Sequence, residues 1–194
     1  MGIHFDSPGV KSVAIDTSKS NGETVYFGAP DVTNFTLSGA GGLSFLGLAE
    51  NLTTFDAAEV GGDITIGVNN AEASWWNPKL VSSATITTGQ GNDYLNFSRS
   101  TGDLKINAGA GDDTIYGGSG ADTFVFSAGY GKDTIRGFEI GKDEIDLSEL
   151  GVAALAPEDI AMSDGNTVVT VAGGTITLIG VSGVTNGDFN FVSA

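Results

Sequence analysis

The chain has 194 residues with 30 glycines, 4 prolines and no cysteine, and its formal charge is −16 at neutral pH. This charge argues against nucleic acid and anionic membrane as partners and favours cations. Without cysteine no disulfide can form, so bound metal is the natural stabilising device for an extracellular protein. Residues 1–10 have neither the basic region nor the apolar core of a secretory signal, and no apolar run is long enough to cross a bilayer. We therefore expect no membrane insertion, and export through a signal other than an N-terminal one.

The first 87 residues consist of short runs in which apolar and hydroxylated residues alternate, separated by Gly, Asn and Asp turns. This alternation is typical of β-strands, and a helical pattern is almost absent. The expected strands are 12–16, 23–27, 34–38, 43–48, 63–68 and 84–88. We expect residues 1–87 to form a metal-poor, β-helix-like domain continuous with the segment that follows. A separate β-sandwich is the alternative.

Two adjacent tryptophans, Trp75 and Trp76, lie in the loop expected between strands 63–68 and 84–88. Both rings cannot point into a thin core, so one is expected on the outside of the molecule. Such a ring could cover an exposed coil end, contact a neighbouring subunit or stack on a sugar. Trp75 and Trp76 are therefore candidate interaction residues, for a second copy of the chain or for a surface polysaccharide.

Residues 88–148 repeat a turn rich in glycine and aspartate that is followed by one large apolar residue. The most complete copies read GGSGADTFV at 117–125 and AGAGDDTIY at 108–116, and looser copies begin at Thr88, Ala128 and Glu139. The copies follow the pattern G-G-x-G-x-D-x-U-x, in which U is a large apolar residue, and the copy from Glu139 keeps only its Gly-x-Asp-x-Ile part. The U positions are Leu95, Ile115, Phe124, Ile135 and Ile145.

This repeat has the chemistry of a calcium turn. Glycine permits positive φ and lets backbone carbonyls approach one another, and the aspartate adds a carboxylate. Calcium takes about 6–8 oxygens, so two stacked turns are needed to complete its shell. The residues x-U-x form a very short strand in which U points inward. The candidate metal residues are Gly89, Gly91, Asp93, Gly109, Gly111, Asp113, Gly118, Gly120, Asp122, Gly129, Gly131, Asp133, Gly141 and Asp143. A glycine-rich region without metal, or a series of Asp-Gly hairpins, is the alternative.

The spacing assigns the turns to two edges of a flattened solenoid. Asp93, Asp113 and Asp133 are 20 positions apart and should stack on one edge, whereas Asp122 and Asp143, 21 apart, should lie on the other. Between Asp93 and Asp113, residues 98–106 must supply the missing half-turn of the other edge. Its Gly102-Asp103-Leu104 is a degenerate loop, so we expect a calcium to be lost there.

With these motifs, residues 88–148 resemble the repeats-in-toxin (RTX) family of calcium-binding secreted bacterial proteins, including the IDLS element at 145–148. The stretches TVVTVAGGTITLIGV at 167–181 and DFNF at 188–191 resemble the C-terminal β-stranded cap and uncleaved type I secretion signal of that family, which we place in residues 149–194. The strands before the repeats resemble those of RTX-type surface-layer proteins. The resemblance implies an all-β, right-handed parallel β-helix or β-roll, bound Ca²⁺, and export by a type I secretion apparatus. The non-glycine residues Thr88, Ala108, Ala128 and Glu139 at the first loop position depart from the family pattern and predict uneven occupancy.

Catalysis has little support in the sequence. His4 is the single histidine, so an H-E-x-x-H zinc site, which needs two histidines, cannot form. The acidic residues are assigned to calcium turns or to the solvated surface. We therefore predict that the chain is not an enzyme but a calcium-binding structural protein. It would fold on calcium and self-assemble at the bacterial cell surface as a surface layer or filament. The alternatives are the secretion and folding module of a larger RTX enzyme, such as a serralysin-like protease, and a glycan-binding adhesin fragment.

Overall fold

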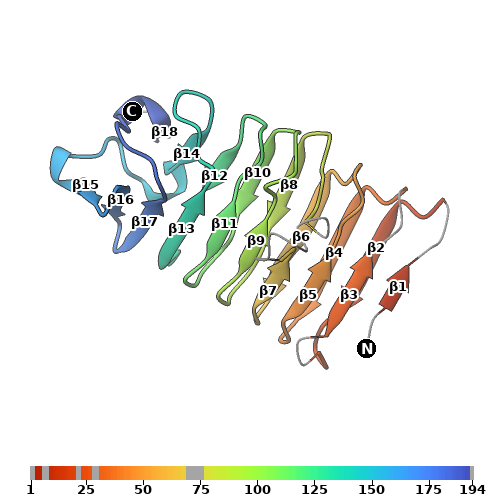
Figure 1. The fold of residues 1–194 in the computed structure, drawn as a ribbon. Helices are drawn as coiled ribbons and strands as arrows, with labels where there is room; N and C mark the ends of the chain where they lie inside the picture. The colour runs from red at the N-terminus through yellow and green to blue at the C-terminus, as the bar shows by residue number, and fades with distance from the viewer. Residues whose placement is uncertain (1–2, 6–8, 21–22, 28–30, 69–76, 193–194) are drawn as a thin grey trace.

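A computed structural model of the chain describes residues 3–5, 9–20, 23–27, 31–68 and 77–192. These residues form two facing β-sheets, and the chain passes from one sheet to the other at each successive strand up to β14 (Figure 1). In spatial order, one sheet contains β1 (Ile3–Phe5), β3 (Thr24–Phe27), β5 (Leu43–Leu46), β7 (Ile64–Ile66), β9 (Tyr94–Asn96), β11 (Thr114–Tyr116), β13 (Lys132–Arg136), β17 (Gly174–Leu178), β16 (Asn166–Val171) and β15 (Ile160–Ser163). The other contains β18 (Phe189–Asn190), β14 (Glu144–Asp146), β12 (Thr123–Val125), β10 (Leu104–Asn107), β8 (Ala84–Thr87), β6 (Thr54–Val60), β4 (Asn34–Gly39) and β2 (Ser12–Asp16).

Strand pairing is parallel from β1 to β17 in the first sheet and throughout the second. The fold is therefore an all-β parallel solenoid of the β-roll type, as predicted. Pairing runs without a break across residues 87 and 88, because β6 pairs with β8 and β8 pairs with β10. The two sheets are thus shared by the N-terminal coils and the repeat coils, which excludes the separate β-sandwich.

The core consists of inward-facing apolar side chains in register from coil to coil. Leu95 is aligned with Ile115, which is aligned with Ile135, and each side chain is at most 1% exposed. Phe124 and Ile145 occupy the same role in the facing sheet and are fully buried. All five predicted U residues therefore point inward. Burial of a side chain of this size contributes about 1.5–3 kcal/mol to folding, so each coil adds to the stability of its neighbours.

The N-terminal coils carry an aromatic core in place of a calcium turn. Phe35 and Phe55 stack with ring centroids 5.6 Å apart, and Phe45 meets both rings edge-on. The six strands expected in this half are present as β2, β3, β4, β5, β7 and β8, and β6 is additional to them. Strand β1 was not predicted from the sequence.

The C-terminal end differs from the rest of the solenoid. β15, β16 and β17 form an antiparallel meander, in which Asp164-Gly165 and Ala172-Gly173 make the two tight turns with positive φ. β17 then extends one sheet beside β13, and β18 extends the other beside β14. The helical elements are single 3₁₀ turns: η2 (Ser148–Leu150), η3 (Pro157–Asp159) and η4 (Asn186–Asp188). Within the described ranges, no helix has the length and apolarity needed to span a membrane.

Candidate metal centre

The turns between the sheets line up on two edges of the solenoid. The first edge contains the turns at 61–63, 88–93, 108–113 and 126–131, together with Lys132 and Asp133 at the start of β13. The second edge contains the turns at 97–103, 117–122 and 137–143. The structure thus places Asp93, Asp113 and Asp133 together on the first edge, and Asp122 and Asp143 on the second.

On the first edge the aspartates form a column joined by backbone-to-carboxylate hydrogen bonds. The Asp93 N–H donates to Oδ1 of Asp113 at 2.8 Å, and the Asp113 N–H donates to Oδ1 of Asp133 at 2.8 Å. The N–H of Ile64 starts the column by donating to Oδ1 of Asp93 at 2.7 Å. All three aspartates are at most 2% exposed. The stacking therefore brings three buried carboxylates into one row.

A second column of hydrogen-bonded side chains runs beside the first. It is formed by the residues that immediately precede Ile64, Asp93 and Asp113 in the sequence. The Asn92 N–H donates to Oδ1 of Asp63, the Asp112 N–H to Oδ1 of Asn92, and the Lys132 N–H to Oδ1 of Asp112, at 2.8 to 2.9 Å. These side chains are exposed. The two columns run in opposite senses and fix the register of consecutive turns.

The carboxylates of the first edge are incompletely satisfied by the protein. Among the described residues, Oδ2 of Asp93 and Oδ2 of Asp113 are buried and accept no hydrogen bond. Burial, with a smaller contribution from neighbouring carboxylates, raises the pKa of Asp113 to about 7 and the pKa of Asp133 to about 8. An unpaired buried charge is strongly destabilising. This edge therefore has an unmet requirement for a cation.

Glycines of the first edge lie directly against carbonyl oxygens of the preceding turn. A Cβ on Gly111, where φ is 134°, would come within 1.8 Å of the Gly91 oxygen, and a Cβ on Gly109 would come within 2.0 Å of the Gly89 oxygen. Only glycine permits this approach. The stacked turns therefore present rows of carbonyl oxygen beside the aspartate column, and carbonyl and carboxylate oxygens are the ligands that Ca²⁺ prefers.

A substitution at Gly111 tests this packing. We expect Gly111→Ala to raise the calcium concentration needed for folding by about tenfold or more, because the left-handed backbone and the carbonyl clash together cost roughly 1–3 kcal/mol. Gly61→Ala is the matched control on the same edge, since its Cβ would meet nothing closer than 3.5 Å. Calcium titration followed by circular dichroism measures both, and equal midpoints for the two variants would refute the stacking.

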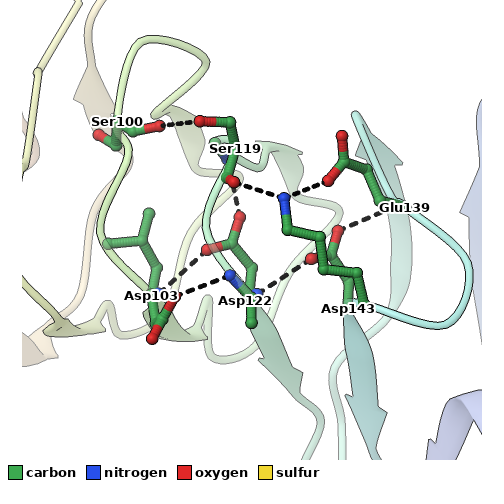
Figure 2. A network of polar contacts seen from close by, with 10 residues as sticks. Ser100, Asp103, Ser119, Asp122, Glu139 and Asp143 are labelled. Carbon is green, nitrogen blue, oxygen red and sulfur yellow. Dashed lines mark hydrogen bonds and ion pairs between the residues drawn. The ribbon is translucent and has the colours of Figure 1, made fainter.

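The second edge has a similar column with a different hydrogen-bond pattern (Figure 2). The Leu104 N–H donates to Oδ1 of Asp122, and the Asp122 N–H donates to Oδ1 of Asp143, each at 3.0 Å. The other carboxylate oxygens are also occupied, because Gly118 N–H donates to Oδ2 of Asp122 and Glu139 N–H donates to Oδ2 of Asp143, each at 2.8 Å. Both oxygens of each buried carboxylate therefore have a protein donor, unlike those of Asp93 and Asp113.

Each column begins where an apolar residue takes the position of the aspartate. The register of β7 with β9 aligns Ile64 with Asp93, and the register of β10 with β12 aligns Leu104 with Asp122. Asp103 therefore occupies the position before the aspartate, where its Oδ1 accepts from the N–H of Ala121 at 2.8 Å. The degenerate loop expected at Gly102-Asp103-Leu104 thus lacks a carboxylate in the column.

Sequence reasoning found the aspartates of both columns but missed the residues that organise them. Asp63, Asn92 and Asp112 build the accompanying column. For Asn92 and Asp112 the signal was a polar residue between the last glycine and the aspartate, whereas Asp63 precedes Ile64 and had no such signal. In the described part of the chain no three acidic or histidine side chains converge on one point, as expected for sites made mainly of carbonyl oxygen. Gly129 and Gly141 take positive φ but have open space around them, so they contact no stacked carbonyl. Trp75 and Trp76 lie outside the described residues.

Comparison with known proteins agrees with this geometry. Residues 105–131 match the family described as RTX calcium-binding nonapeptide repeat (4 copies). No curated protein matches the chain. Among solved structures, the chain is similar to the extracellular lipase LipA from Serratia marcescens, with 14% sequence identity and a TM-score of 0.40. That similarity covers 95% of this chain but 38% of the lipase chain, so this chain spans well under half of that protein.

Residues 105–131 are therefore RTX calcium-binding repeats, and the resemblance of the repeats to those of RTX calcium-binding proteins is confirmed. Their cofactor is Ca²⁺. The residues present fit the ion, since Oδ2 of Asp93 and Oδ2 of Asp113 are buried acceptors without a donor, and glycine carbonyl oxygens of consecutive turns lie on the same edge. Bound calcium would neutralise the column and join consecutive turns. RTX repeat β-rolls are generally non-catalytic, and RTX proteins are typically secreted by bacteria.

Proposed function

We propose that the protein is a secreted structural protein that folds on calcium outside the cell and assembles at the bacterial cell surface through its N-terminal end. The proposal rests on one observation about the described residues: no element among them covers the first coil. Strands β1 and β2 are the terminal strands of the two sheets, and no described strand pairs with their outer edges. Exposed strand edges are sites of association unless they are covered.

The core is also incompletely covered at this end. Val13 and Ile15 of β2 pack on the core but are only partly buried, whereas Phe35 and Leu37, aligned with them one coil further in, are at most 1% exposed. At the opposite end, the meander of β15 to β17 and strand β18 extend over the last coils (Figure 1). A second copy docked on β1 and β2 would complete the hydrogen bonds and the apolar contact together.

Calcium would control this association through charge. A net charge of −16 opposes contact between copies, and bound Ca²⁺ would cancel part of it. Trp75 and Trp76, which lie between β7 and β8 in the sequence of the N-terminal half, are proposed as a further contact with a second copy, since aromatic side chains dominate many protein interfaces. The type I secretion apparatus is the proposed export partner.

Assembly is tested by analytical ultracentrifugation at high protein concentration, with millimolar calcium and with chelator. We expect oligomers in calcium only, and their loss in the double variants Val13→Asp/Ile15→Asp and Trp75→Ala/Trp76→Ala. Met162→Asp is the control, because Met162 is 56% exposed in β15 at the other end of the molecule. A protein that stays monomeric in calcium would defeat the assembly proposal and favour the secretion-module alternative.

A further inference from the structure

Lys142 reaches from its own turn to the preceding turn of the second edge. Its ammonium group donates to the main-chain oxygen of Ser119 and forms an ion pair with the carboxylate of Glu139 (Figure 2). Ser119 belongs to the turn at 117–122, which is 23 residues earlier in the chain. A positive charge therefore joins two consecutive turns of this edge.

The position of this ammonium group is significant because of the carboxylates beside it. Asp122 and Asp143 lie in the same two turns, and the Asp122 N–H donates to Oδ1 of Asp143 across the gap. A carbonyl oxygen of one turn and carboxylates of both turns are the types of ligand that a calcium ion takes between stacked RTX turns. The lysine thus supplies a cation to a gap with the ligand chemistry of a calcium site.

The first edge provides a natural comparison. Lys132 has the same place in its repeat, between Gly131 and Asp133, as Lys142 has between Gly141 and Asp143. Among the described residues, however, the ammonium group of Lys132 makes no hydrogen bond or ion pair. On that edge two buried carboxylate oxygens, Oδ2 of Asp93 and Oδ2 of Asp113, also have no partner. The second edge thus has both a lysine that bridges two turns and buried carboxylates whose oxygens all have donors. The described residues of the first edge have neither.

We propose that Lys142 is a tethered cation that takes the place of one calcium ion, in the gap between the turns at 117–122 and 137–143. Its chain holds the ammonium group at high effective concentration, so it competes with free Ca²⁺ for the same oxygens. The C-terminal gap of the second edge is then satisfied in the absence of calcium, and the calcium requirement falls mainly on the first edge. This inference rests on calcium binding by the repeats and is independent of assembly.

The test is the number of calcium ions bound at saturation by the full chain, measured by equilibrium dialysis. We expect Lys142→Gln to bind about one more calcium ion than the unmodified protein, because the substitution removes the competing charge. Lys132→Gln, at the matching position of the first edge, should bind the same number as the unmodified protein, and so should Lys142→Arg, which keeps the charge. An unchanged number in Lys142→Gln overturns the proposal.

A second measurement uses the unmodified protein and decides the matter if Lys142→Gln does not fold. In saturating calcium, an ammonium group held by the Ser119 oxygen and the Glu139 carboxylate should react slowly with acetic anhydride even though the Lys142 side chain is 41% exposed. We expect acetylation of Lys142, followed by mass spectrometry, to be at least several-fold slower than acetylation of Lys132. Equal rates would show that calcium displaces the lysine from the gap and would overturn the proposal. Failure of the assembly experiment would leave both of these results unaffected.

Discussion

In the presence of a chelator the repeat segment at 88–148 should lose its β structure, and millimolar calcium should restore it. The reason is the buried aspartate column of the first edge, in which Oδ2 of Asp93 and Oδ2 of Asp113 have no donor. Removing one partner of a buried charge pair typically costs about 3–5 kcal/mol. The free-energy cost of several such charges in one row exceeds the gain from burying one apolar side chain per strand.

Calcium reverses this balance by binding the folded state only. One site at 100 times its Kd contributes about 2.7 kcal/mol, and several sites in one column add to one another through the stacked turns. Circular dichroism during a calcium titration measures the transition. Part of the β signal should survive in chelator, because the N-terminal coils have the Phe35, Phe45 and Phe55 core and need no metal.

Magnesium is the control for this experiment. It demands six ligands in near-octahedral geometry at about 2.0–2.1 Å and gives up its water reluctantly, so it should not replace calcium between flexible carbonyl turns. Equal β content in chelator and in calcium would show that the roll folds without metal. The buried carboxylates would then not make folding depend on calcium.

The second large effect is expected at Asp113. Asp113→Asn should lower the number of bound calcium ions by about one and raise the calcium midpoint by about tenfold or more, since one charged ligand is lost while an oxygen remains for the Asp93 N–H. Asp113 lies between Asp93 and Asp133 in the column, so its loss also weakens the neighbouring gaps. Isothermal titration calorimetry gives both quantities.

The matched variants are Asp122→Asn in the second column and Asp103→Asn outside it. Asp122→Asn should remove fewer calcium ions than Asp113→Asn, because Lys142 takes the gap on one side of Asp122 and the loop at 97–103 lacks the aspartate on the other. Asp103→Asn should change little, because Asp103 is exposed, lies before the aspartate position and makes one hydrogen bond to Ala121 N–H that asparagine can preserve. Equal losses in all three variants would mean that the register of the two edges is incorrect.

The fold could be predicted from the sequence because the repeat encodes both period and direction. A spacing of 20 residues fixes which turns share an edge, and the single apolar residue after each aspartate fixes which face of the strand is buried. These features correctly placed Asp93, Asp113 and Asp133 on one edge and oriented Leu95, Ile115 and Ile135 inward. The assignment needed no knowledge of side-chain contacts.

The contacts within the turns could not be predicted in this way. Asp63 acts as the first acceptor of the accompanying column, yet in the sequence it appears only as the residue before a strand. Lys132 and Lys142 have identical positions in their repeats but different surroundings, since the Lys142 ammonium group finds the Ser119 carbonyl across the gap. Such differences depend on the conformation of the neighbouring turn. Sequence spacing carries no information about them.

The equal register of β9, β11 and β13 allows the length of this sheet to be changed in steps of one coil. Thr114, Ile115 and Tyr116 align with residues 20 positions before and after them, so a 20-residue coil can be removed or duplicated in register here, whereas the facing sheet has spacings of 18 residues (Lys105 to Thr123) and 21 residues (Thr123 to Glu144). Each such step would shift the two ends by about 4.8 Å, the distance between neighbouring strands. The length of the solenoid can thus change in steps of one coil. The span between an N-terminal contact and the C-terminal meander can be altered in fixed increments while both ends stay the same.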